Sequence, residues 1–142
     1  MFYSVSVLDN FVRKKMQYYL IGLGIYPNTT GYYSIIECVS AAVEKDSLAG
    51  KINSIYAEVA FRINKSVTAI ERGIRFGVNK SISDNRMSEI NNYFGYQVYS
   101  VNYPLRNGEF IGLFAKKVLD DYQKEVDCGV LSGNSENNLC VI

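Results

Sequence analysis

A chain of 142 residues that is 48% hydrophobic and contains only two prolines has the size and composition of one globular domain with a single core. Histidine is absent, which excludes imidazole-dependent serine and cysteine catalysis and histidine-ligated metal sites. The formal net charge of +1 does not by itself indicate a polyanionic partner. We therefore expect no enzyme, and neither a metal nor another cofactor.

Two amphipathic helices are predicted in the first third of the chain. From Ser6 onward, apolar residues recur at intervals of three and four, which is the period of a helix with one buried face. This helix should end at Gly24 and Pro27. A second helix of the same period starts after the Thr-Thr-Gly sequence at 29–31, and Gly50 closes it.

The next two predicted helices are joined so closely that they form a helix-turn-helix, at roughly Ser54 to Ser81. One run of apolar residues covers 52–63 and a second covers 67–78, which leaves three residues between them. The second of these helices, about Ser66–Ser81, is the expected recognition helix, because that part of a helix-turn-helix lies in the major groove.

The residues around this turn meet the steric demands of a helix-turn-helix. Ala60 is small where the two helices must approach each other, and Asn64 tolerates the left-handed backbone of a sharp turn. Ser66 can cap the following helix by accepting a hydrogen bond from a free backbone N–H. The apolar side chains expected to point inward are Val67, Ile70 and Ile74.

Two further helices complete an all-α prediction of a compact bundle of about six helices. A short one spans Met87 to Phe94 and ends at Gly95, and a longer one spans about Glu109 to Tyr122. The segment Tyr96–Tyr103 loses its alternating pattern at Tyr99, so a loop is expected there. Residues 1–125 would form the single domain, and 126–142, rich in Gly, Ser and Asn, a disordered tail.

The outer face of the recognition helix is suited to reading DNA. Residues 51–86 carry seven basic side chains against three acidic ones. At about 100° per residue, the positions opposite the apolar stripe are Thr68, Arg72, Phe76 and Asn79, and Arg75 borders them. A guanidinium can bond a guanine edge with two hydrogen bonds. The alternative is a solvated face with a Glu71–Arg75 ion pair worth only ~0.3 kcal/mol.

Phe76 and the polar residues at the ends of the helix have two interpretations each. A phenylalanine opposite the core stripe should contact a thymine methyl or pack on another helix or subunit, and packing is slightly favoured. Residues suited to positioning the helix on phosphates are Lys65, Ser66, Asn79 and Lys80. An ordinary surface role for these residues is equally compatible with the pattern.

Three blocks of sequence resemble the C-terminal effector domain of the sporulation-initiation transcription factor, the stage zero sporulation protein A family. They are INSIYAEVAFRINKSVTAIERGIRFGVNKSI, FGYQVYS and NGEFIGLFAKKVL, and the resemblance extends from about Val5 to Tyr122. It implies a six-helix DNA-binding domain that reads a short guanine-containing box, often as tandem copies. It further implies that Glu71, Arg72 and Arg75 contact or orient bases, and that Lys65 and Ser66 meet phosphates.

The sequence departs from that family at two points. Phe76 occupies a position that is usually histidine, and the loss of this hydrogen-bond donor is expected to change the preferred box. In 142 residues there is also no room for the receiver domain that carries the family's phosphorylated aspartate.

The leading hypothesis is a sequence-specific DNA-binding transcription regulator. Its expected partner is double-stranded DNA, with a homodimer or tandem copies on DNA as an open alternative to a single copy. We expect neither a membrane nor a small-molecule substrate, and the odd number of widely spaced cysteines favours a reducing cytoplasm. The alternative function is a protein-interaction module that keeps the fold but modulates a full-length regulator without reading DNA.

Overall fold

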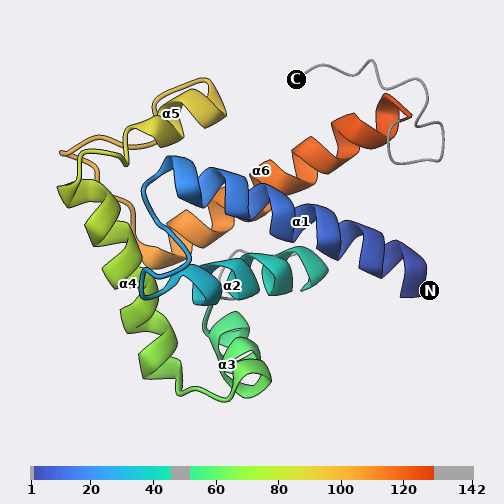
Figure 1. The fold of residues 1–142 in the computed structure, drawn as a ribbon, viewed down its shortest axis with the longest axis horizontal. Helices are drawn as coiled ribbons and strands as arrows, with labels where there is room; N and C mark the ends of the chain where they lie inside the picture. Colours follow the sequence, from blue (N-terminus) through green and yellow to red (C-terminus); the bar gives the residue numbers. More distant parts are fainter. Residues whose placement is uncertain (1, 46–51, 130–142) are drawn as a thin grey trace.

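The computed structural model describes residues 2–45 and 52–129, with side chains from residue 7 onward. These residues form six helices and no β-strand, which confirms the all-α prediction (Figure 1). Only an isolated bridge joins Ser100 and Tyr103. The helices are α1 (Phe2–Gly22), α2 (Tyr32–Lys45), α3 (Ile52–Ile63), α4 (Val67–Ser83), α5 (Glu89–Phe94) and α6 (Asn107–Asp127).

Helix α2 occupies the middle of the bundle. It packs against α1, α3, α4 and α6, and the two long helices α1 and α6 also pack against each other. Ten of its residues are buried, which explains why its sequence is apolar on several sides. Helix α4 runs along one side of the molecule (Figure 1). None of the described helices is both long and apolar enough to cross a lipid bilayer.

The local signals in the sequence lie where helices begin and end. The hydroxyl of Ser66 accepts a hydrogen bond of 3.0 Å from the backbone N of Ala69, as a helix cap does. Asn64 has φ 58° at the turn before α4, and Gly95 has φ 81° at the end of α5. These positions were predicted correctly because capping and left-handed turns depend on few neighbouring residues.

The last two helices differ from the prediction at their ends. Helix α5 begins at Glu89, two residues later than predicted. Met87 lies before the helix, and its side chain is buried. Helix α6 begins at Asn107, because the Glu109 carboxylate accepts a hydrogen bond of 2.9 Å from the backbone N of Arg106 and starts the helix early. The predicted loop at 96–103 is observed.

At its other end α6 continues through Asp127, two residues into the segment predicted as a tail. Just before this extension α6 packs on α1, where the rings of Phe11 and Tyr122 meet edge to face at 5.4 Å. Residues 128 and 129 form a turn, whereas the predicted helix end at Gly50 and residues 130–142 of the predicted tail lie outside the described residues.

A buried polar contact also joins α1 to α6. The carboxylate of Asp121 is almost completely buried and accepts a hydrogen bond from the Tyr19 hydroxyl. Its second oxygen lies 3.1 Å from the ammonium of Lys117. Both oxygens of this buried carboxylate therefore have partners, as burial of a charge requires.

Alkaline pH is expected to destabilise the domain through its buried tyrosines. Burial raises the pKa of Tyr56 to about 12 in the folded chain, whereas an unfolded tyrosine titrates near ~10. A raised folded pKa contributes stability that is complete below the unfolded pKa and is lost as pH rises toward the folded one. From about pH 8 to about pH 11, Tyr56 alone should lower the free energy of unfolding by about 1 kcal/mol.

Urea denaturation at these two pH values measures this loss. The variant Tyr56→Phe has no ionisable hydroxyl at this position, so the same rise in pH should cost it about 1 kcal/mol less. An equal loss in the variant and the parent chain would contradict the role of Tyr56.

Candidate nucleic-acid interface

Helices α3 and α4 form the predicted helix-turn-helix. The turn is closed by a hydrogen bond of 3.0 Å from the backbone N of Lys65 to the backbone O of Ala60. Ala60 is buried at this junction. Helix α4 is seated on the start of α2, where the backbones of Gly31 and Gly73 approach so closely that neither position has space to spare for a larger side chain. Helix α4 is thus held by its contacts with α2 and α3, and it also contacts α6.

The buried and outer faces of α4 follow the helical wheel with one exception. Ile70, Ile74 and Val78 are completely buried, and Thr68, Arg72 and Asn79 are exposed on the opposite side. Phe76 is also on the surface, with 52% of its area exposed.

The exception is Val67, which was predicted to point inward and is 38% exposed. This prediction was wrong because Val67 is the first residue of α4, ahead of the part of the helix that packs against α2. The periodicity of a helix says which side a residue is on, but not where the neighbouring helix ends.

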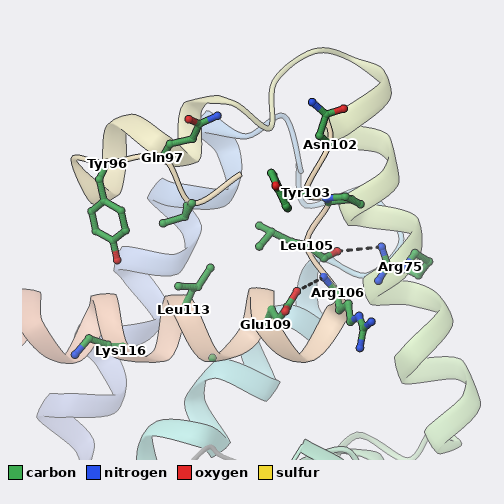
Figure 2. A pocket seen from close by; sticks show the side chains of 13 residues that line it. Arg75, Tyr96, Gln97, Asn102, Tyr103, Leu105, Arg106, Glu109, Leu113 and Lys116 are labelled. Atoms are coloured by element: carbon green, nitrogen blue, oxygen red, sulfur yellow. Dashed lines mark hydrogen bonds between the residues drawn. The ribbon is translucent and has the colours of Figure 1, made fainter. Parts of the chain in front are cut away.

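Arg75 lies between the outer face and a cleft beside α4. Its guanidinium donates a hydrogen bond of 3.4 Å to the backbone O of Leu105, in the segment before α6 (Figure 2). Glu71 is exposed, and its backbone O accepts a hydrogen bond of 3.0 Å from the side chain of Asn107. A Glu71–Arg75 ion pair is not among the ion pairs of the described residues. The solvated-face and DNA-reading interpretations of this face both stay predictions.

The residues predicted to meet phosphates differ in the partners that they already have in the fold. Lys65 and Ser66 are exposed at the start of α4, and the Ser66 hydroxyl, which accepts the cap bond, keeps its own proton to donate. Lys80 forms an ion pair of 2.8 Å with Asp84, so it would have to exchange this partner for a phosphate. Asn79 lies on the outer face, between Arg72 and the end of the helix.

Comparison with protein families identifies the family to which this helix-turn-helix bundle belongs. The family model described as sporulation initiation factor Spo0A C terminal matches residues 16–118. This match covers the complete helix-turn-helix and most of the bundle. The chain belongs to the Spo0A C-terminal family. No solved structure matches the chain.

Membership in the Spo0A C-terminal family gives the general class of function. The family consists of DNA-binding effector domains of a sporulation transcription regulator and is not a family of enzymes. The resemblance seen in the sequence is confirmed. The six-helix bundle is also what this family implies.

Sequence reasoning missed that the segment leading into α6 lies beside the outer face of α4. Asn107 lies with Glu71, Arg72 and Phe76 around an open hollow of about 480 Å³ on the outer side of α4. The partners of Asn107 and Leu105 on α4 are 36 and 30 residues away in the sequence. No periodicity or local motif connects residues so far apart, so only the packing of the bundle reveals this neighbourhood.

Proposed function

We propose that the chain is a sequence-specific DNA-binding transcription regulator whose α4 enters the major groove. The observation that carries this proposal is the exposed outer face of α4, where the Arg72 guanidinium has no hydrogen-bond or ion-pair partner among the described residues. The proposed base contacts are Thr68, Glu71, Arg72, Arg75 and Phe76. The proposed phosphate contacts are Lys65, Ser66, Asn79 and Lys80.

The chemistry of this face favours a guanine-containing site. Arg72 is free to form two hydrogen bonds to the major-groove edge of guanine, whereas Arg75 reaches the groove by exchanging its weak bond to Leu105. Between them, the Glu71 carboxylate can orient an arginine or accept a hydrogen bond from cytosine. Phe76 offers only an apolar contact, for which a thymine methyl is the complementary group.

A protein-interaction module is the second candidate, and Phe76 favours it. A large apolar side chain that is 52% exposed beside charged residues is also typical of a protein contact. In this case α4 would pair with a full-length regulator and DNA binding would be weak. A cytoplasmic location and action as a homodimer or as tandem copies on DNA are further parts of the main proposal.

The variant Arg72→Ala tests the main proposal. A preferred duplex is first selected from a pool of randomised sequences, and affinity is then measured for it and for a scrambled duplex. Loss of a bidentate base contact costs about 1–3 kcal/mol, so affinity for the preferred duplex should fall about 5- to 150-fold while affinity for the scrambled duplex changes little. Lys14→Ala, which removes an equal charge from the exposed side of α1, is the matched control.

Two results would contradict the proposal. If the selection yields no preferred sequence and the parent chain binds all duplexes feebly, the protein-interaction module becomes the better explanation. If a preferred duplex exists but Arg72→Ala binds it as tightly as Lys14→Ala does, then α4 does not read bases through Arg72.

A further inference from the structure

The six arginines of the chain differ in how they are partnered. Arg13 is paired with Asp9 and Glu37, and Arg62 with Glu44 and Glu58. Arg86 donates to the backbone O of Gly22 at 2.8 Å and so caps the end of α1. These three guanidinium groups are therefore used to hold helices together.

The other three arginines lie on one side of the molecule, around α4. Arg72 and Arg75 belong to α4 itself, and the third is Arg106, which directly precedes α6. The side chain of Arg106 is exposed, and among the described residues no carboxylate lies within ion-pair distance of it. A planar cation kept without a partner beside a candidate DNA-reading helix is the arrangement that a phosphate contact needs.

The position of Arg106 beside α4 is fixed by its neighbours in the sequence. Leu105 accepts the hydrogen bond from Arg75, and Asn107 donates to the backbone O of Glu71 at 3.0 Å. On the other side, Gly108 faces Ile52, the first residue of α3, and a Cβ added at Gly108 would lie 3.6 Å from the Ile52 side chain. The residues on both sides of Arg106 are therefore bound to the helix-turn-helix.

The backbone of this segment is held as well. The Asn91 side chain bonds the backbone of Val98 and Tyr99 at 2.7–3.0 Å and so orders the loop that follows α5. The Glu109 carboxylate bonds the backbone N of Arg106 at 2.9 Å. Figure 2 shows the Arg106 side chain leaving the start of α6 beside α4, whereas Lys116 lies at the far end of the same cleft.

We infer that Arg106 binds a backbone phosphate of the DNA, at the edge of the groove that α4 enters. This inference rests on the proposed function, to which it adds a contact from outside the helix-turn-helix. A phosphate is the expected ligand because Arg106 precedes α6 and flanks α4, while base edges lie deeper in the groove along the outer face of α4. The contact fixes the angle of α4 and carries no sequence preference.

The test compares Arg106→Gln with Lys116→Gln. Both variants remove one positive charge from an exposed side chain on the same side of α6, but Lys116 is ten residues along the helix, about 15 Å away. Affinity for the preferred duplex and for a scrambled duplex is measured at several salt concentrations. Thermal melting of each variant confirms that the fold is intact.

Arg106→Gln should weaken binding to both duplexes by a similar factor, about three- to tenfold at low salt. The slope of log affinity against log salt should become shallower by about 0.9, the value for one lost phosphate contact. Lys116→Gln should keep the slope of the parent chain. The variant Arg106→Lys, which retains the charge, should recover most of the slope.

Three outcomes would overturn the inference. Equal salt slopes for Arg106→Gln and the parent chain would show that Arg106 binds no phosphate. Equal losses of affinity in Arg106→Gln and Lys116→Gln would show that the effect comes from the change in net charge and not from a contact at Arg106. A loss confined to the preferred duplex would make Arg106 a base contact. These results are distinct from failure of the proposed function, in which the parent chain itself shows no preferred duplex.

Discussion

Replacing Gly31 by alanine should destabilise the domain by about 3 kcal/mol or more, the sum of a strained backbone and a steric clash. Gly31 has φ 98°, a conformation that side chains rarely adopt. A Cβ there would lie 1.9 Å from the backbone O of Gly73, and neither backbone can move without shifting α2 or α4. Thermal melting should show a midpoint lower by roughly 10 °C.

Gly95→Ala is the matched control for this variant. Gly95 also has a positive φ, of 81°, but a Cβ at this position would meet nothing within 4 Å. It therefore carries the backbone strain without the clash and should cost only about 1 kcal/mol. If the two variants melt at the same temperature, the close approach of α2 and α4 at Gly31 is not a determinant of stability.

Replacing Asp121 by alanine is expected to have an equally large effect, about 3–5 kcal/mol, because it breaks a buried ion pair from one side. Asp121 is 1% exposed. Its removal leaves the buried hydroxyl of Tyr19 and the largely buried ammonium of Lys117 without their shared partner. Urea denaturation should show a lower midpoint with little change in the slope.

The neighbouring aspartate provides the control. Asp120 is exposed, so Asp120→Ala should change the free energy of unfolding by no more than about 0.5 kcal/mol. Tyr19→Phe removes only the hydroxyl, leaves the Asp121–Lys117 pair intact and should cost about 1 kcal/mol. Similar stabilities for Asp120→Ala and Asp121→Ala would show that the buried carboxylate does not join α1 to α6 energetically.

Much of the helix-turn-helix was predictable because its determinants are local. Asn64 adopts the left-handed turn and Ser66 caps α4, as their side-chain chemistry indicates. The outer position of Phe76 also follows from the helical wheel. Val67 was predicted wrongly because its burial depends on the extent of the neighbouring helix. The assignment of individual DNA contacts stays a prediction that the binding experiments address.

The state of the charged side chains was not predictable in the same way. Lys80 pairs with Asp84 within its own helix end, a spacing visible in the sequence, although the sequence does not say whether the pair forms. Arg75 bonds to Leu105, and nothing in the local pattern points to that partner. Whether an arginine is available for DNA depends on which acceptors the fold brings near it.

The sequence alone determined the helices, the turn between α3 and α4 and membership in the Spo0A C-terminal family, because periodicity, caps and motifs act over a few residues. The tertiary structure alone decided that the start of α6 lies beside α4, that Asp121 is buried while Asp120 is exposed, and that Arg106 lies near the arginines of α4. The physical reason is that such contacts join residues tens of positions apart, and only the packing of one helix face on another brings them together.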